Sequence, residues 1–290
     1  MKVAGAPITW GICEVPGWGA QLAPERVLRE VASLGLTAIE LGPPGFLPGS
    51  PADIARLLAC HGITLAAGFV PVVLHRPELR DGALATLSTE AAALAEAGAE
   101  LLVLAAALDG RGYDRSADLT HSEWDLLLEG LALAHAIGKR HGLAVALHPH
   151  YGTAIERAHQ VAEVVNRSDI GLCLDTGHLM VGGVDSAEVV RAAGSRVIHV
   201  HLKDVDAGLA ARVRSGELGY RDAVMRGMYR PLGDGDVDLL AVLELLSARG
   251  YAGWYVLEQD VVLDGEPAEG AGPVASAARS IDFLTRILPH

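Results

Sequence analysis

Hydrophobic residues gather in eight short runs along the chain, and longer amphipathic segments separate one run from the next. Most runs are almost continuously apolar rather than alternating, which is typical of β-strands buried on both faces. We therefore predict eight strands, at residues 3–9, 37–41, 63–70, 101–107, 143–148, 170–175, 196–202 and 253–258.

The segments between these runs carry the spacing of amphipathic helices. Several begin with proline or a small polar residue, as at Ser50 and Pro51, which favours a helix start. Four of them end at a glycine that precedes the next run, and glycine is a common helix C-cap. The predicted helices are residues 24–34, 51–61, 82–97, 122–141, 154–166, 186–193, 237–249 and 273–288.

Eight strands alternating with eight helices predict an α/β protein with the (β/α)₈ TIM barrel fold, as a single domain over residues 1–290. A doubly wound open sheet would favour a glycine-rich phosphate turn after the first strand, and residues 9–13, TWGIC, do not provide one. The long connection at 204–236 is predicted to be a lid over the barrel mouth with an extra helix at 217–227. The alternative for this insert is an ordinary surface excursion.

Composition narrows the class of protein. The 290 residues are 50% hydrophobic and carry a formal net charge of −13, which argues against a nucleic-acid partner because little would neutralise phosphates. The N-terminus has no signal-peptide core, and no apolar run is long enough to cross a membrane. Cys13, Cys60 and Cys173 lie far apart, as in a reducing compartment. We expect a soluble cytoplasmic protein without membrane contact; pairing into a homo-oligomer stays open.

Residues capable of chemistry fall at the carboxyl ends of the predicted strands, where a TIM barrel builds its active site. Strands five to eight end in His, Asp, His and Glu, a ligand mix that suits Mn²⁺, Co²⁺, Zn²⁺ or Fe²⁺ better than Ca²⁺ or Mg²⁺. The strand-end residues are Trp10, Glu40, Phe69, His148, His150, Asp175, His178, His199, His201, Lys203, Asp204, Glu258, Gln259 and Asp260.

Each of these residues also has a structural interpretation. Asp175 could cap the turn that follows it, and Glu258 could be a solvated charge. His199 and His201 are two apart and share a strand face, so His199 is the deeper core histidine and His201 the better ligand candidate. Four such residues on neighbouring strands together favour a site.

Several motifs resemble those of a known family. They are PITWGICEVPGWG (7–19), IELGPPGFLP (39–48), LHPHYGT (147–153), LDTGHL (174–179), HVHLKDV (199–205) and PLGDGDVD (231–238). In this order they resemble the inosose (2-keto-myo-inositol) dehydratases of the xylose-isomerase-like sugar isomerase/epimerase superfamily. The resemblance runs from about residue 7 to about residue 260, and HPHYGT and MYRPLGDGDVD are its most specific parts.

The resemblance implies one divalent metal ion in the barrel, Mn²⁺ or Co²⁺ before Zn²⁺ or Fe²⁺. The ligands of the family's epimerases fall here on Asp175, His201 and Glu258. Their fourth ligand, a glutamate on strand five, is missing, since His148 stands in its place. Either His148 is the ligand, or Glu156 reaches back to supply a carboxylate.

The implied reaction is the dehydration of 2-keto-myo-inositol or a related keto-cyclitol. One base takes the proton α to the ketone and one acid helps the β-hydroxyl to leave. Glu258 is the base candidate, and His150, His178 and Lys203 are the candidate proton donors. Contacts with the small polyol or keto-sugar substrate are assigned to Trp10, Trp18, Phe69, Glu40, His150 and Asp204.

The alternative enzyme is a metal-dependent keto-sugar or inosose isomerase or epimerase on the same barrel. A histidine at position 148 disfavours it, because a proton shift between two carbons uses a symmetric pair of carboxylates. A metal-dependent endonuclease conflicts with the net charge of −13. A sugar-binding protein without catalysis is the remaining alternative.

Overall fold

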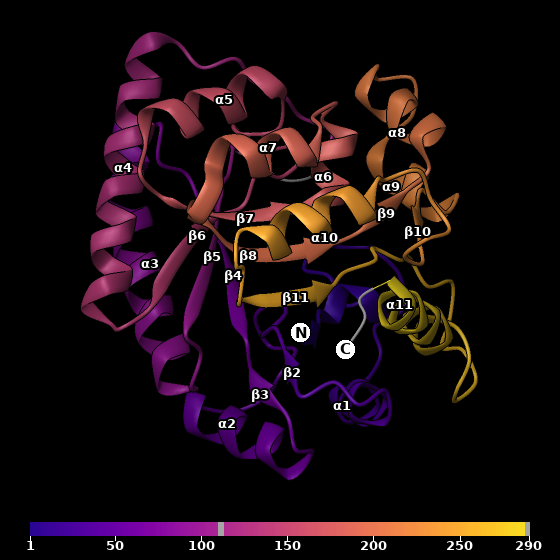
Figure 1. Cartoon of the computed structure of the whole chain (residues 1–290). Helices are drawn as coiled ribbons and strands as arrows, with labels where there is room; N and C mark the ends of the chain where they lie inside the picture. The colour runs from indigo at the N-terminus through magenta and orange to yellow at the C-terminus, as the bar shows by residue number, and fades with distance from the viewer. Residues whose placement is uncertain (110–112, 288–290) are drawn as a thin grey trace.

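The apolar runs form the strands of one parallel sheet in the computed structural model, which describes residues 1–109 and 113–287 (Figure 1). The strands are buried on both faces, most completely in β5, where all six residues are buried. The sheet strands are β1 (Lys2–Gly5), β2 (Ala38–Ile39), β3 (Thr64–Leu65), β4 (Ala67–Val72), β5 (Leu101–Ala106), β6 (Ala144–Leu147), β7 (Gly171–Asp175), β8 (Val197–Leu202) and β11 (Trp254–Leu257).

The sheet closes into a barrel. Its strands follow the order β3-β2-β1-β11-β8-β7-β6-β5-β4, and the neighbouring strands pair in parallel. β3 and β4 stand at the two ends of this order, yet only Ala66 separates them in the chain, so together they are one barrel strand. The predicted (β/α)₈ barrel is therefore confirmed.

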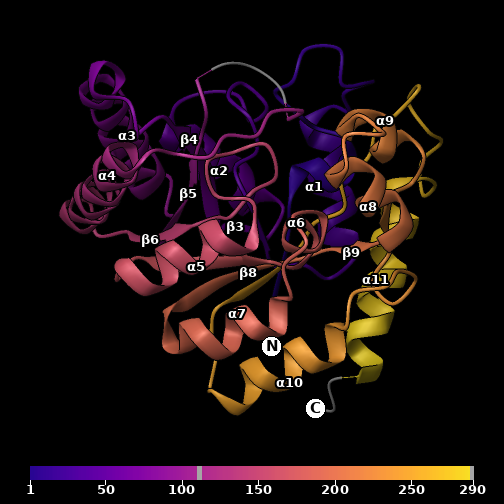
Figure 2. The ribbon, with the colours of Figure 1, turned by 90° about the horizontal axis from the view of Figure 1, so that it is seen from above.

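Helices follow the barrel strands in alternation and surround the barrel (Figures 1 and 2). Two of them begin with capping boxes, in which Ser50 pairs with Asp53 and Thr120 with Glu123. The outer helices are α1 (Pro24–Ser33), α2 (Pro51–Cys60), α3 (Pro77–Glu96), α4 (His121–Arg140), α5 (Ala158–Arg167), α7 (Ser186–Ala193), α10 (Leu239–Ala248) and α11 (Pro273–Ile287). Leu288, the last residue of the final predicted helix, lies outside the described residues.

Three predicted boundaries were wrong by four residues or more, each for a local reason. Helix α3 begins at Pro77 rather than at Gly82, because proline is favoured in the first turn of a helix. The first strand ends at Gly5 rather than near Trp10, because Pro7 begins a 3₁₀ turn (η1, Pro7–Trp10). Helix α5 begins at Ala158 rather than at Ala154, because the side chain of Gln160 accepts the backbone N–H groups just before the helix. The intervening residues form a loop at the barrel mouth.

The predicted insert is a small folded unit. β9 (Asp204–Val205) pairs antiparallel with β10 (Tyr229–Arg230), and α8 (Ala207–Arg214) and α9 (Tyr220–Met225) lie between them in place of the single helix predicted at 217–227. Figure 1 shows α8 and α9 beyond the arrowheads of β7 and β8, and Figure 2 shows α8 beside the short helix α6 (Thr176–Val181). A further 3₁₀ turn, η2 (Gly194–Arg196), precedes β8.

The insert has a hydrophobic cluster of its own, separate from the core between barrel and helices. This cluster includes Val205, Val213, Tyr220, Val224, Met228 and Tyr229 from the insert, with Trp18 and Val181 from the barrel loops. Because burial of such side chains stabilises a fixed arrangement, the insert is held against the carboxyl ends of the strands.

Candidate active site

Four neighbouring strands bring the predicted metal ligands together. β6, β7, β8 and β11 are consecutive in the sheet, and the register places Asp175 beside His201. His201 Nδ1 lies 2.7 Å from Glu258 Oε2 and 3.5 Å from Asp175 Oδ2. One ligand atom from each of these three residues lies within 4.8 Å of the others. The convergence that the sequence indicated is present.

Asp175 uses its two carboxylate oxygens differently. Oδ1 accepts the backbone N–H groups of Gly177 and His178, at 2.9 and 2.7 Å, and so caps α6. Oδ2 is left facing the barrel axis, 3.2 Å from His148 Nε2. The capping role and the ligand role considered for Asp175 are thus compatible, because each uses a different atom.

The two candidates for the fourth ligand lie in different environments. His148 joins the cluster, with its ring centroid 4.8 Å from that of His201. The carboxylate of Glu156 instead accepts the backbone N–H of Gly152 at 2.8 Å and pairs with Arg157 at 3.2 Å. Glu156 therefore holds the loop after β6, and its carboxylate is engaged away from Asp175.

Glu40 lies behind the cluster as a partner of two histidines. Its Oε1 lies 2.8 Å from His199 Nε2 and 3.0 Å from His201 Nε2. Burial opposes the charged carboxylate, but His201 and His199 outweigh burial and hold the pKa of Glu40 below its ordinary value. When Nε2–H donates to Glu40, a neutral His201 can offer the lone pair of Nδ1 to a cation beside Asp175 and Glu258. Glu40 was predicted as a substrate contact, and the structure engages its carboxylate with these rings instead.

Lys203 supplies a buried ammonium group beside the cluster. Its Nζ lies 2.8 Å from Asp260 Oδ1, 3.0 Å from His178 Nε2 and 3.3 Å from Glu258 Oε2. Burial opposes the charge, but Asp175, Asp260 and Glu258 hold the pKa of Lys203 well above its ordinary value. Lys203 therefore remains a charged ammonium group in a buried pocket, where carboxylates surround it.

The hydrogen-bond pattern assigns the protons on the neighbouring histidines. An ammonium group only donates, so His178 presents the lone pair of Nε2 to Lys203. His150 Nδ1 donates to the Tyr151 carbonyl at 2.7 Å, and its ring packs on that of His178 with centroids 3.7 Å apart. Of the three predicted proton donors, Lys203 is the one whose proton faces Glu258.

The donor set fits a divalent cation. His201 Nδ1 and Glu258 Oε2 are buried and face each other, yet neither makes a hydrogen bond of good geometry within the described residues. Unpaired buried polar atoms are costly, and a cation would satisfy both lone pairs. Although burial lowers it, Cys173, Glu258 and Glu40 raise the pKa of His201 well above its ordinary value, so this pocket favours positive charge. Mixed nitrogen and oxygen donors suit a transition ion.

The other predicted substrate contacts divide into two groups. Phe69 lies at the site, with its ring 5.9 Å from that of His148 and 6.0 Å from that of His150. Trp10 does not, because η1 turns its indole into the core, where Nε1–H donates to Glu30 at 2.8 Å. Trp18 packs in the insert's cluster and donates to the Val261 carbonyl.

Asp204 was predicted to contact substrate, and its carboxylate is occupied by the backbone. Oδ1 accepts from Val205 N–H at 2.9 Å and Val237 N–H at 3.0 Å. Oδ2 accepts from Gly233 N–H at 2.8 Å and Gly235 N–H at 3.0 Å. With four donors bound, Asp204 anchors the end of the insert to β9.

Two tyrosines and an aspartate lie at the site without a role assigned to them from the sequence. Asp260 was recognised only as a strand-end residue beside Glu258, and Tyr229 only as part of the predicted lid, whereas Tyr220 was not singled out. Tyr220 donates to Asp260 Oδ2 at 2.8 Å, and its hydroxyl lies 2.8 Å from that of Tyr229. No local pattern marks Tyr220, because its contact depends on how the insert folds back.

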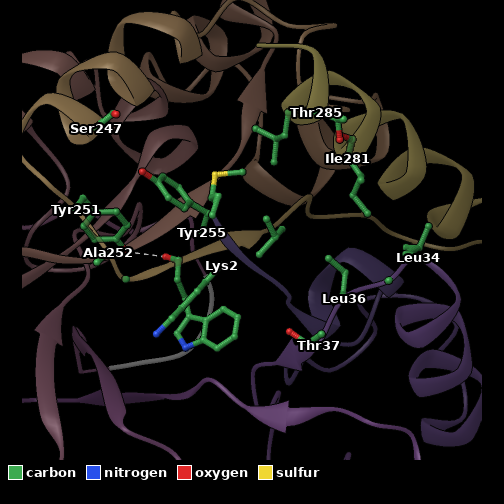
Figure 3. Close-up of a pocket in the computed structure, with 16 residues that line it drawn as sticks. Lys2, Leu34, Leu36, Thr37, Ser247, Tyr251, Ala252, Tyr255, Ile281 and Thr285 are labelled. Carbon is green, nitrogen blue, oxygen red and sulfur yellow. Dashed lines mark hydrogen bonds between the residues drawn. The ribbon is translucent and has the colours of Figure 1, made fainter. Parts of the chain in front are cut away.

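The opposite end of the barrel contains a cavity of about 900 Å³ (Figure 3). It is lined by apolar and aromatic side chains from the amino ends of β1 and β11 and from α11, including Tyr251, Tyr255 and Ile281 (Figure 3). None of the clustered His, Asp, Glu and Lys residues described above lines it. Within residues 1–109 and 113–287, no helix combines the length and apolarity needed to cross a bilayer.

Comparisons with known proteins agree with this architecture. The family model described as "Xylose isomerase-like TIM barrel" matches residues 28–287. An inosose dehydratase of Geobacillus kaustophilus is 30% identical over 300 aligned residues, covering 100% of this chain and 95% of that protein.

Two solved structures share the fold at low sequence identity. D-psicose 3-epimerase with D-tagatose, from Clostridium cellulolyticum H10, superposes with a TM-score of 0.73 at 20% identity, covering 100% of both chains. IOLI protein, whose crystal structure holds a zinc atom, superposes with a TM-score of 0.70 at 17% identity, covering 99% of this chain and 98% of the other.

Proposed function

The chain belongs to the xylose isomerase-like TIM barrel family as an inosose dehydratase-like member, and from this we propose that it dehydrates 2-keto-myo-inositol or a related keto-cyclitol with the help of a divalent metal ion. As a dehydratase it is a hydro-lyase. The observation that carries the proposal is the meeting of Asp175, His201 and Glu258 beside the Lys203 ammonium. This arrangement combines a cation site, a carboxylate base and a proton donor.

The metal would be held by Asp175, His201 and Glu258, with His148 as the fourth ligand. When bound, a divalent ion supplies a Lewis acid that polarises the ketone oxygen of the substrate. The nitrogen and oxygen donors suit Mn²⁺, Co²⁺, Zn²⁺ or Fe²⁺, and the resemblance to inosose dehydratases favours Mn²⁺ or Co²⁺ among them. The zinc atom in IOLI protein supports a divalent metal in this fold.

Glu258 is the proposed base. Its side chain is 12% exposed, whereas those of Asp175 and His201 are at most 1% exposed, so Glu258 is the member of the cluster nearest to an entering substrate. Its Oε2 faces His201 and the cation site, so the second carboxylate oxygen is the one left for the substrate. A carboxylate in this position can take the proton from the carbon next to the ketone.

Lys203 is the proposed acid. As the C–O bond of the β-hydroxyl breaks, the oxygen keeps the electron pair and takes a proton from Nζ, so water leaves. His178 fixes the ammonium by accepting one of its N–H groups. The rings of Phe69 and His150 form the adjacent wall, on which the apolar faces of the cyclitol ring can pack.

The insert serves as the cover of this site. It packs as one cluster over α6 and the strand ends, and the clustered polar residues beneath it are almost fully buried. A cover that excludes water strengthens the electrostatic interactions inside the site.

The direct test is incubation of the Mn²⁺- or Co²⁺-loaded protein with 2-keto-myo-inositol, followed by mass analysis of the product. We expect loss of one molecule of water, and no reaction after chelation of the metal. A product of unchanged mass would support the isomerase or epimerase alternative. Absence of any reaction with this substrate and related keto-cyclitols would contradict the proposal.

A further inference from the structure

The insert contributes two buried tyrosine hydroxyls to the active site. Tyr220 lies on α9 and is fully buried, and Tyr229 lies on β10 at 3% exposure. The two hydroxyl oxygens are 2.8 Å apart, and Tyr220 donates to Asp260 Oδ2 at 2.8 Å. Because a phenol has one proton, Tyr229 must donate to Tyr220. The hydroxyls therefore form a directed chain that ends on Asp260.

Asp260 joins this chain to the ammonium of Lys203. Its Oδ1 accepts from Lys203 Nζ at 2.8 Å while Oδ2 accepts from Tyr220, so both carboxylate oxygens are occupied by donors. The ring of Tyr229 also faces Nζ, which lies 5.2 Å from the ring centroid. The insert thus supports Lys203 through a hydrogen-bond chain and through an aromatic face.

These contacts decide where the remaining N–H of Lys203 points. An ammonium group has three N–H donors, and two are taken by Asp260 Oδ1 and His178 Nε2. The third is left for the side of Glu258 Oε2, 3.3 Å away, and Asp175 Oδ2, 3.5 Å away. A lysine side chain is a flexible four-carbon stem, so this direction depends on its anchors.

We propose that Tyr220, Tyr229 and Asp260 are positioning residues, which aim the free N–H of Lys203 at the departing β-hydroxyl and so govern water loss separately from α-proton removal. This inference rests on the proposed dehydratase function. In the aimed step the C–O bond breaks with its electron pair on oxygen, the proton from Nζ completes the water, and Lys203 regains a proton from solvent. The α-proton goes to Glu258, to which Tyr220, Tyr229 and Asp260 make no direct hydrogen bond within the described residues.

The two steps can be separated by isotope exchange. The metal-loaded enzyme is incubated with 2-keto-myo-inositol in D₂O, and deuterium at the α-carbon of recovered substrate is measured beside the rate of water loss. In Tyr220→Phe and Asp260→Asn we expect water loss to slow by about 10- to 100-fold, because a misaimed catalytic group commonly costs that much. Exchange is expected to persist, so the ratio of exchange to dehydration rises by about the same factor.

The matched control is Tyr251→Phe. Tyr251 is a half-buried tyrosine whose hydroxyl donates to the Trp254 carbonyl at 2.7 Å at the other end of the barrel, and its variant should keep the wild-type ratio. A merely structural role for Tyr220 would lower exchange and dehydration together. An unchanged ratio in Tyr220→Phe and Asp260→Asn would therefore overturn the inference.

Two safeguards keep the test decisive. Tyr229→Phe removes the terminal donor and leaves Tyr220 and Asp260 in place, so this variant replaces Tyr220→Phe if the latter fails to fold. In Tyr229→Phe we expect a smaller rise in the ratio of exchange to dehydration. Wild-type enzyme that releases no water would overturn the proposed function and this inference together. Wild-type enzyme that does release water, with no change of ratio in any variant, would overturn the inference alone.

Discussion

The two ends of the barrel differ in the features by which a binding site is usually recognised. The amino end has the space, a cavity of about 900 Å³ with aromatic and aliphatic walls (Figure 3). The carboxyl end has the chemistry, with histidines, carboxylates and a lysine buried within hydrogen-bonding distance of one another. Convergent polar groups whose pKa values are strongly shifted indicate function, whereas volume alone does not.

Chain direction explains the contrast. All barrel strands run in parallel, so their carboxyl ends meet at one mouth, and the following loops add residues such as His150 and Asp260 to it. At the amino end, the chain enters the strands from helix ends, and residues there such as Leu36 pack in the core. The comparison can be tested by changing the two ends separately.

The largest effect is expected from Asp175→Asn. The remaining side-chain oxygen can still cap α6, but the charge facing His148 and His201 is lost. We expect at least about a 10³-fold fall in kcat/KM, because metal ions contribute several kcal/mol to such reactions. Metal content by elemental analysis should fall with it, and thermal stability should fall too, because Lys203 loses a buried counter-charge. Full metal content with wild-type activity would contradict the proposed ligand set.

Next comes Lys203→Met, which keeps the length of the side chain and removes the ammonium. We expect water loss to fall by about 10²- to 10⁴-fold, the usual contribution of a positioned general acid. Bound metal should remain, since the cation ligands are intact. Dehydration within a few-fold of wild type would assign the acid role to another group.

A smaller effect is expected from Glu40→Gln. The amide has only one oxygen that accepts hydrogen bonds and carries no charge, so its hydrogen bond with His201 Nε2 is weaker than that of the carboxylate. Metal affinity should fall by about 10- to 100-fold, as for other partners of metal-bound histidines. Titration of the apo-protein with Co²⁺ measures it. Unchanged affinity would mean that Glu40 does not act through His201.

The smallest effect is expected at the amino end, from Thr285→Leu. This substitution narrows the cavity of Figure 3 without touching the carboxyl-end cluster. Stability should change by no more than about 0.5 kcal/mol, as is usual for exposed positions, and activity should be unchanged. Chemical denaturation and the dehydration assay check both values. A large loss of activity would remove the distinction between the two ends.

The barrel was predictable from sequence because its signal is local. Continuous apolar runs mark strands that are buried on both faces, and glycine and proline mark the helix ends. The errors came from particular side chains: Pro7 shortens the first strand, and Gln160 delays the start of α5. Neither effect appears in hydrophobic periodicity.

The candidate site was predictable only where strand order fixes position. Asp175, His201 and Glu258 converge because parallel strands in register must bring their ends together. The pairing of Glu40 with His201 spans 161 positions, and the contact of Tyr220 with Asp260 joins two segments outside the strands. Such contacts depend on the packed structure, so sequence spacing gives no indication of them.

The carboxylate of Asp204 has a consequence for how this barrel could be altered. By binding four backbone N–H groups, it ties the place where the insert leaves β8 to the place where the chain rejoins the barrel before α10. The two ends of the insert therefore lie side by side at this carboxylate. We expect that a segment attached in that way can be exchanged between related barrels, so that a different cover could be joined to the same cluster of His, Asp and Glu residues.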